Sequence, residues 1–210
     1  MTAAVALAPV ADPPRTLSPF PSTRALALEQ TPMHALETEF MRGGTPSLDD
    51  LVGWEFRGIN HLPLNVLPVA QLVGIKKFVK GFYREPKVES GGPAPTGGKD
   101  GRVMGYNRGV RRNPLDGRWH VRPTRYGFYE VHEVDATSID NKYLHAVLLN
   151  YGRGGNKPYD PTGGLRDYVV QLDTDLFLGK AYFALGPVRV PTNFFILERH
   201  RPGLTDYEKR

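Results

Sequence analysis

The chain has 210 residues, 40% of them hydrophobic, with a formal net charge of +5 and no cysteine. This length predicts one folded domain, because single domains usually run to about 100–200 residues and β-barrels reach the upper end of that range. The absence of cysteine excludes disulfide bonds, thiolate metal sites and cysteine nucleophiles. It also fits a reducing compartment, so we expect a cytoplasmic protein. No run approaches the ~20 apolar residues of a transmembrane helix.

The first 31 residues are rich in Ala, Pro, Ser and Thr and show no sustained apolar period. The opening MTAAVALAPVADPPR has no basic residue before its short apolar stretch, which does not fit a secretory signal. A segment of this composition buries too little surface to offset the entropy of ordering it. The sequence therefore predicts a disordered arm over 1–31 whose deletion leaves the melting temperature nearly unchanged. A barrel domain over 32–200 and a flexible tail over 201–210 are expected to follow.

The barrel domain is expected to open with one or two short helices. Met33, Leu36 and Phe40 recur at spacings of three and four, which predicts a helix over 32–41, and a capped turn follows over 47–50. Short runs rich in aromatic and β-branched residues then recur at intervals of about ten, separated by Gly, Pro, Asn and Asp. The expected strands are Trp54–Asn60, Lys76–Tyr83, Arg102–Val110, Gly117–Arg122, Gly127–Asp135, Tyr143–Tyr151, Asp167–Leu172, Leu176–Ala184 and Thr192–His200.

Short connections between these runs predict a mainly β fold, a single antiparallel up-and-down β-barrel of eight or nine strands, because closure removes the exposed sheet edges. Residues 64–72 are expected to form a short helix or lid across one end. Two long glycine-rich loops, 86–100 and 152–164, interrupt the pattern, and loops of this length are usually functional or disordered.

Basic residues are concentrated between Lys76 and Arg125, where thirteen of them face four acidic residues, a local charge of +9. Such an asymmetry favours an anionic partner, or it is a solvated basic face. Aromatic residues alternate with the basic ones, as in proteins that bind single-stranded nucleic acid. The chain has no RRM or KH signature, so nucleic-acid binding is not favoured.

Motifs for catalysis and for metal binding are missing from the sequence. None of the six histidines forms a local zinc-type pair, no Gly-x-Ser-x-Gly elbow occurs, and we expect no metal and no cofactor. His200, at the end of the last expected strand, leaves haem ligation in a small barrel as an alternative. Carboxylates inside apolar runs, such as Asp167 and Glu198, must be paired if buried. The sequence leaves two roles open for these carboxylates, structural ion pairing and acid catalysis.

Two stretches resemble a known family. Gly53–Gly58 (GWEFRG) resembles the opening of calycin, or lipocalin-like, barrels, and more closely the bacterial GXWXG family with its companion C-terminal domain of unknown function. The tail repeats the order of that family's C-terminal half through Asn150-Tyr151, 158–161, 165–168, Leu178-Gly179 and 194–199. The resemblance implies a closed barrel that holds one small hydrophobic ligand. It also implies that Arg199 on the last strand stacks on Trp54 or Phe56 of the first.

Binding of a small hydrophobic or amphipathic ligand inside the barrel is therefore the leading hypothesis, with fatty-acid-like or isoprenoid-like molecules as examples and an anionic group favoured by the basic half. Aromatic residues on consecutive strands are the candidates to line the site: Phe78, Phe82, Tyr106, Trp119, Phe128, Tyr143 and Phe183. A small barrel enzyme, such as an isomerase, cyclase or decarboxylase acting on a hydrophobic acid, is the alternative. A module that binds nucleic acid or anionic membrane through its basic face is a further one.

Overall fold

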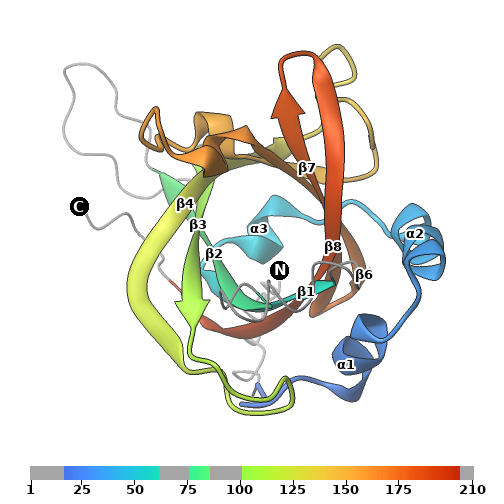
Figure 1. Ribbon diagram of the computed structural model, residues 1–210, viewed down its shortest axis with the longest axis vertical. Helices are drawn as coiled ribbons and strands as arrows, with labels where there is room; N and C mark the ends of the chain where they lie inside the picture. Colours follow the sequence, from blue (N-terminus) through green and yellow to red (C-terminus); the bar gives the residue numbers. More distant parts are fainter. Residues whose placement is uncertain (1–16, 62–75, 86–100, 204–210) are drawn as a thin grey trace, which may run out of the picture.

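The computed structural model describes residues 17–61, 76–85 and 101–203, and its eight strands form one closed barrel (Figure 1). Each strand is antiparallel to the next in chain order, and the last pairs with the first. This meander confirms the mainly β class and the single antiparallel barrel. The strands are β1 (Trp54–His61), β2 (Lys77–Glu85), β3 (Arg102–Val110), β4 (Val121–Glu133), β5 (Val147–Asn150), β6 (Leu165–Asp173), β7 (Leu176–Leu185) and β8 (Val188–Pro202).

Eight strands replace the nine expected runs because one glycine lies within a strand and does not end it. The runs 117–122 and 127–135 contribute to a single strand, β4, which passes through Gly127. The loop over 152–164 contains two short 3-10 helices, η1 (Tyr151–Arg153) and η2 (Pro161–Gly164). The lid expected at 64–72 and the loop over 86–100 lie outside the described residues.

The structure differs from the disordered arm expected over 1–31, because helix α1 (Thr23–Glu29) lies within it. Ser22 caps this helix by accepting a hydrogen bond from the Ala25 amide at 3.1 Å. Ala25 and Leu28 are buried against the outer wall of the barrel. The average composition of residues 1–31 therefore did not reveal the capped helix near the end of this segment. Residues 1–16 lie outside the described part of the chain.

Two further helices precede the barrel. Helix α2 (Met33–Arg42) buries Leu36 and Phe40 against the outer wall, and both α1 and α2 lie outside the ring of strands in Figure 1. Helix α3 (Leu48–Leu51) instead appears within the ring in that view, and Leu51 packs among the residues of the barrel interior. We refer to the end of the barrel that α3 covers as its closed end.

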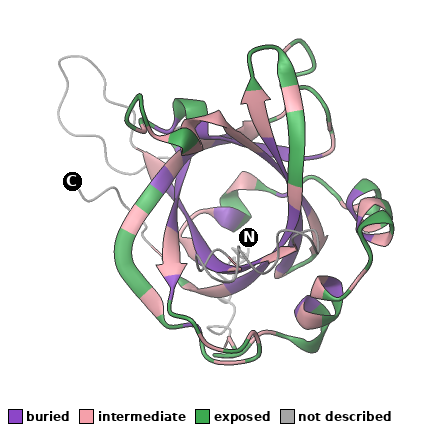
Figure 2. Ribbon diagram, viewed as in Figure 1, coloured by how far each residue is buried: buried purple, intermediate pink, exposed green. Residues whose placement is uncertain are grey.

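Several strands are buried on both faces, as the purple ribbon segments of Figure 2 show. Outward-facing side chains of β6, β7 and β8, such as Val170, Leu178 and Ile196, pack with α1 and α2 in one cluster. Inward-facing neighbours on the same strands, such as Val169 and Leu197, form a second cluster inside the barrel. A strand covered on both sides needs apolar residues on both faces. Runs such as VLL and FFIL therefore do not alternate and do not reveal which residues face inward.

Side chains fill the closed half of the barrel. The ring of Phe56 meets the rings of Phe82 and Phe177 edge-on, with centroids 5.4 and 5.3 Å apart. Next to these rings, Cζ of Arg199 lies 4.7 Å from the ring centroid of Trp54 and 5.3 Å from that of Phe56. This is the contact that the calycin resemblance implies.

Arg199 also links β8 to the turn between β6 and β7 and to α3. We therefore expect its replacement to lower the stability of the fold. Its Nε donates to Asp175 at 2.8 Å, and its Nη1 donates to the carbonyl of Asp50 at 2.9 Å. Arg199→Ala should lower the free energy of unfolding by about 2–3 kcal/mol, because it removes charged hydrogen bonds and the stacking contact together. Arg199→Lys should recover only part of this loss, since an ammonium lacks the planar fork. Urea unfolding of the three proteins tests this, and equal stability of all three would contradict it.

Candidate functional site

A bulge in β4 shapes the half of the barrel opposite α3. Gly105 of β3 faces Tyr129, but two residues later Asn107 faces Tyr126, so β4 carries one extra residue between them. Gly127 supplies that residue in the left-handed region, at φ 53°, which side chains disfavour. The extra residue places both tyrosines on the inner face, and the Gly127 carbonyl accepts a hydrogen bond from Asn107 Nδ2 at 2.8 Å.

Lys80 is the centre of a polar network inside this half of the barrel. It lies in β2, is 2% exposed, and its Nζ is 3.1 Å from Oδ1 of Asn107 and 3.1 Å from Oδ2 of Asp167. The Tyr151 hydroxyl accepts a third hydrogen bond from the same amine. That hydroxyl also donates to Asp167 at 3.2 Å. Strands β2, β3 and β6 and the first residue of η1 thus converge on one ammonium group.

Burial alters the acid–base behaviour of this network. It lowers the pKa of Lys80, although the ion pair with Asp167 opposes the shift. It raises the pKa of Tyr151 well above the ordinary tyrosine value, and the negative charge of Asp167 acts in the same direction. A lysine whose ammonium form is destabilised in this way is closer to neutral than a surface lysine.

Aromatic rings surround the same amine. Its nitrogen lies 4.8 Å from the ring centroid of Tyr129 and 5.1 Å from that of Tyr151. The rings of Phe78 and Phe195 are 5.5 and 5.3 Å away. Cation–π contacts of this kind stabilise a cation where water is excluded. Lys80 is therefore held by one carboxylate, two neutral polar groups and an aromatic enclosure.

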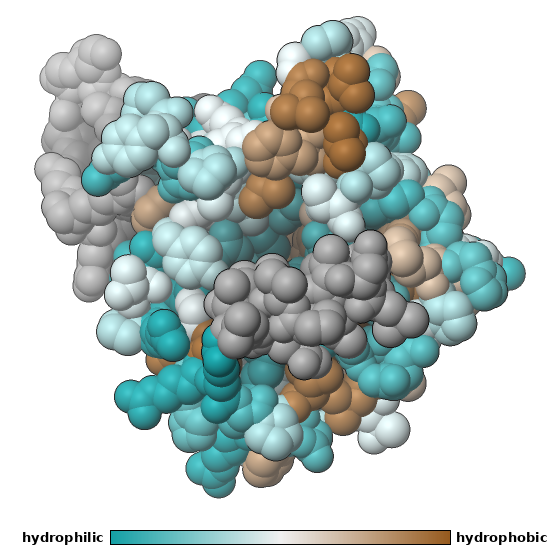
Figure 3. Space-filling view, viewed as in Figure 1, coloured by the Kyte–Doolittle hydropathy of each residue, from teal (hydrophilic) through white to brown (hydrophobic). Residues whose placement is uncertain are grey.

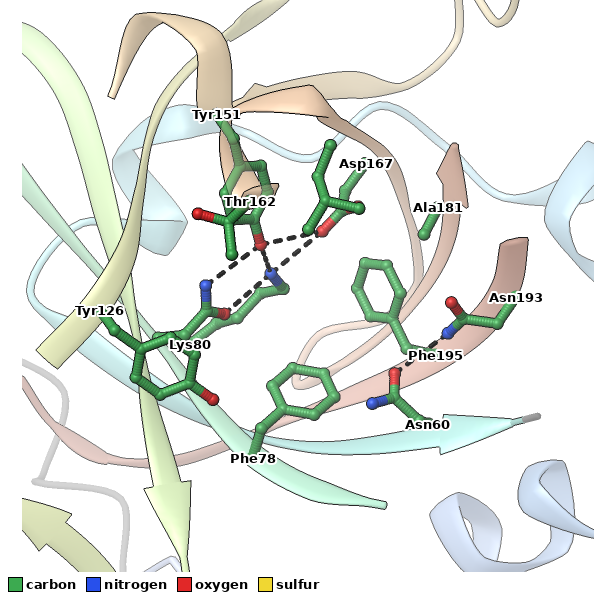
Figure 4. A pocket seen from close by; sticks show the side chains of 12 residues that line it. Asn60, Phe78, Lys80, Tyr126, Tyr151, Thr162, Asp167, Ala181, Asn193 and Phe195 are labelled. Carbon is green, nitrogen blue, oxygen red and sulfur yellow. Dashed lines mark hydrogen bonds and ion pairs between the residues drawn. The ribbon is translucent and has the colours of Figure 1, made fainter. Parts of the chain in front are cut away.

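A cavity of about 170 Å³ lies beside this network. Figure 4 shows the Lys80 amine turned toward Tyr151 and Asp167, with Phe78 and Phe195 across the space from them. An amide pair adds a second polar wall, in which Asn193 Nδ2 donates to Asn60 Oδ1 at 3.0 Å. The cavity is lined by Asn60, Phe78, Lys80, Asn107, Tyr126, Tyr151, Thr162, Leu165, Asp167, Ala181, Asn193 and Phe195.

An apolar patch marks the hairpin between β7 and β8. Ala181 and Asn193 line the cavity from these strands, which continue past it to the hairpin. Leu185, Val188 and Val190 are exposed there, and they form the brown area at the top of Figure 3. A ligand reaching the cavity along these strands would therefore pass an apolar edge.

The aromatic residues expected to line the site divide between the two faces of the wall. Phe78 lines the cavity, while Phe82 faces inward but belongs to the packed closed half. The Phe183 ring packs over Gly164 and does not line the cavity. The remaining four, Tyr106, Trp119, Phe128 and Tyr143, pack in clusters on the outer face and do not reach the cavity.

The outward placement of these residues has identifiable causes. Tyr106 covers Gly81 on the outer face, and its hydroxyl donates to Glu55 at 2.9 Å. Trp119 lies over Lys77, whose Nζ is 3.8 Å from the ring centroid, and Tyr143 packs edge-on against Phe40 of α2. Helices and loops bury this outer face, so aromatic side chains are needed there as well as inside.

The polar residues of the site were not identified from the sequence. Lys80 belonged to the basic stretch, and Asp167 was noted only as a carboxylate in an apolar run that needs a partner. That requirement was the available signal, but the partner, Lys80, lies 87 positions earlier in the chain. Tyr151 was singled out only as part of the resemblance to a known family, and Asn107 was not singled out at all.

Ion pairs neutralise part of the positive charge of the basic stretch between Lys76 and Arg125. Besides Lys80, four of its members pair with carboxylates: Lys76 with Glu29, Arg84 with Asp49, Arg102 with Glu85, and Arg108 with Glu55. These ion pairs weaken the positive electrostatic field that the sequence alone suggests for an anionic partner.

His200 lies outside the cavity, and burial together with Arg57 and Arg201 lowers its pKa to about 4.

Among residues 17–61, 76–85 and 101–203, no group of three or more His, Asp or Glu side chains is arranged to hold a metal ion. Within the same ranges, no helix has the length and apolar character needed to cross a membrane. No family model, curated protein or solved structure matches this chain.

Proposed function

We propose that the barrel binds one small amphipathic molecule, about the size of a single substituted ring, in the cavity between Lys80 and Phe78. The supporting observation is the 170 Å³ space with a polar network on one side and two phenyl rings on the other. A cavity of about 150 Å³ in another protein holds benzene. A long fatty-acid or isoprenoid chain would need the volume that Phe56, Phe82 and Phe177 fill, so a compact ligand fits better.

The polar network favours a ligand with a hydroxyl, carbonyl or amide group. Lys80 and Asp167 form a pair without net charge, so the cavity does not require a charged ligand. Their hydrogen bonds, with that of Tyr151, can orient one polar group, while Phe78 and Phe195 contact the apolar part. Few convergent polar groups in an otherwise apolar concavity are typical of small-molecule sites.

We further propose that the chain is related to calycin barrels and acts in the cytoplasm. The eight-stranded meander and the contact of Arg199 with Trp54 and Phe56 support the relationship. The absence of cysteine supports a reducing compartment.

Filling the cavity should abolish binding. Ala181 faces the cavity from β7, so Ala181→Phe should remove saturable binding of benzyl alcohol and benzamide, measured by ligand-observed NMR. Ala184→Phe is the matched control, because Ala184 lies on the same strand but does not line the cavity. Native protein and the control should each bind about one molecule per chain. Absence of binding in folded native protein, or equal binding by both variants, would contradict the proposal.

Proton-transfer catalysis is the second candidate function. It is favoured by the Tyr151 hydroxyl, which lies between the Lys80 amine and the Asp167 carboxylate at the edge of the cavity. A carboxylate and a hydroxyl held within hydrogen-bonding distance are what general acid–base chemistry needs, and the pKa of this hydroxyl is shifted by burial. Turnover of a bound probe that Tyr151→Phe abolishes without loss of binding would favour this candidate.

A further inference from the structure

We propose that Lys80 binds small ketones and aldehydes covalently, by forming an imine between its Nζ and the carbonyl carbon. This inference rests on the proposed binding of small molecules in the same cavity and specifies the reactive group they would carry. It assigns Lys80 a chemical role in addition to its role in packing.

The geometry places one amine at the boundary between a polar and an apolar wall. Lys80 is one of the residues that line the cavity, although it is only 2% exposed, and its amine lies beside Tyr151 and Asp167 in Figure 4. Four aromatic rings have their centroids within 5.5 Å of it, which limits its contact with water. A carbonyl compound in the cavity would therefore meet this nitrogen in a site where hydrolysis by bulk water is hindered.

Asp167 supplies the proton transfers that imine formation needs. Its Oδ2 is 3.1 Å from Nζ, so it can accept a proton from the Lys80 ammonium and leave a neutral amine. The amine lone pair attacks the carbonyl carbon, and the C=O π pair moves to oxygen, which takes the proton from the Asp167 carboxyl group. The nitrogen then returns a proton to Asp167, giving a neutral carbinolamine.

The second half of the reaction releases water. The Asp167 carboxyl group protonates the carbinolamine hydroxyl, the C–O bond breaks, and the nitrogen lone pair forms the C=N bond. The product is an iminium cation beside the Asp167 carboxylate. The three ammonium protons are then accounted for, one on the iminium nitrogen and two in the water, so no oxidant or other reactant is required. The cation–π contacts around Nζ would stabilise the iminium charge as they stabilise the ammonium.

Two other lysines show why burial or pairing alone is not sufficient. Lys180 contacts Glu37 at 2.6 Å and three aromatic rings, but it lies outside the cavity. Although burial opposes the change, hydrogen bonds to Glu37 and Tyr143 raise its pKa. Burial lowers the pKa of Lys77 to about 8, yet its amine is packed against Trp119 and also lies outside the cavity. Of these three lysines, Lys80 alone combines a destabilised ammonium with a space for a ligand.

Acetylacetone tests the proposal without a reducing agent. This diketone has the size of a small ring, and condensation with an amine releases one water and leaves a stable enaminone with near-ultraviolet absorption. An ordinary lysine with a pKa of 10.4 is neutral in roughly one molecule in 2,500 at pH 7. We expect one enaminone per full-length chain, mapped by peptide mass spectrometry to Lys80, forming at least about tenfold faster than at any other lysine.

Three variants make the result specific. Lys80→Met should lose the absorption band, Lys77→Met should retain it, and Ala181→Phe should lose it while keeping Lys80. Peptide mapping of the native protein locates the label directly, so the test does not depend on Lys80→Met being folded. Labelling at Lys77 or at exposed lysines without labelling at Lys80 would overturn the proposal, as would labelling that Ala181→Phe leaves unchanged.

Failure of the covalent step is distinguishable from failure of the binding proposal. Benzyl alcohol has no carbonyl group, so its binding reports the cavity alone. Saturable benzyl alcohol binding without an enaminone would overturn the imine and leave the binding site standing. Absence of both in folded protein would overturn both proposals.

Discussion

Asp167→Asn should lower the free energy of unfolding by about 3–5 kcal/mol at pH 7, because it leaves the ammonium of Lys80 buried without its counter-charge. The two side chains of this pair are 3% and 5% exposed, so water cannot replace the lost carboxylate. The loss of stability is limited because Lys80 can release its proton and remain buried as a neutral amine. Neutralising a lysine with an ordinary pKa of 10.4 at pH 7 costs about 4.6 kcal/mol. Urea unfolding measures the change.

A carboxylate on the same strand provides the control. Asp173 pairs with Arg24 at 2.7 Å, but these side chains are 57% and 53% exposed. Asp173→Asn should therefore change the free energy of unfolding by less than about 1 kcal/mol, as exposed ion pairs usually do. Equal effects of Asp173→Asn and Asp167→Asn would show that the Lys80–Asp167 pair is not sheltered in solution.

The pH dependence gives a second readout of the same change. Burial lowers the pKa of Lys80 in the folded state, and removing Asp167 removes the charge that opposes this shift. The unfolded chain keeps the lysine proton up to a pH of about 10.4, so it binds more protons than the folded state below that value. Asp167→Asn should consequently gain stability as the pH rises toward 10, by at most about 1.4 kcal/mol per unit. Stability that falls over this interval relative to native protein would contradict the assignment.

The strand pattern was readable because its turns are local. Gly, Pro, Asn and Asp separate the apolar runs, and the expected Arg102–Val110 coincides with β3. The expected break between residues 122 and 127 is absent because β4 continues through a bulge at Gly127. A positive φ at one residue depends on the partner strand, so the sequence of β4 alone does not reveal it.

The candidate site was less readable because it depends on which face each residue occupies. Outward and inward positions of β6 to β8 are both apolar, since α1 and α2 cover the outside. On β2 and β3, Phe78 and Tyr106 also looked equivalent in sequence, although only Phe78 lines the cavity and Tyr106 packs with Tyr83 on the outer face. The Lys80–Asp167 pair joins residues that only barrel closure brings together. Local spacing carries no information about such a contact.

Deleting residues 1–30 should destabilise the barrel by at least about 3 kcal/mol, roughly 6–12 °C in Tm for a chain of this size, where the sequence predicted almost no change. The deletion removes α1 and exposes the outer wall that Ala25 and Leu28 cover. It also removes contacts to charged residues, among them the hydrogen bonds from the Ser22 amide to Glu198 at 3.1 Å and from Arg57 to the carbonyl of Ser18 at 2.9 Å. The ion pairs of Arg24 with Asp173 and of Glu29 with Lys76 are lost as well.

Point variants separate packing of α1 from loss of the remaining arm. Leu28 is 8% exposed and packs on the barrel, whereas its neighbour Ala27 is exposed. Leu28→Asp should cost at least about 3 kcal/mol, since it removes a buried leucine and buries a carboxylate in its place. Ala27→Asp introduces the same residue at an exposed position of the helix and should cost less than about 1 kcal/mol, mainly through helix propensity. Thermal and urea unfolding of the full-length variants measure both. Similar small losses from the two substitutions would show that α1 does not hold its place on the wall, and the deletion should then leave Tm unchanged.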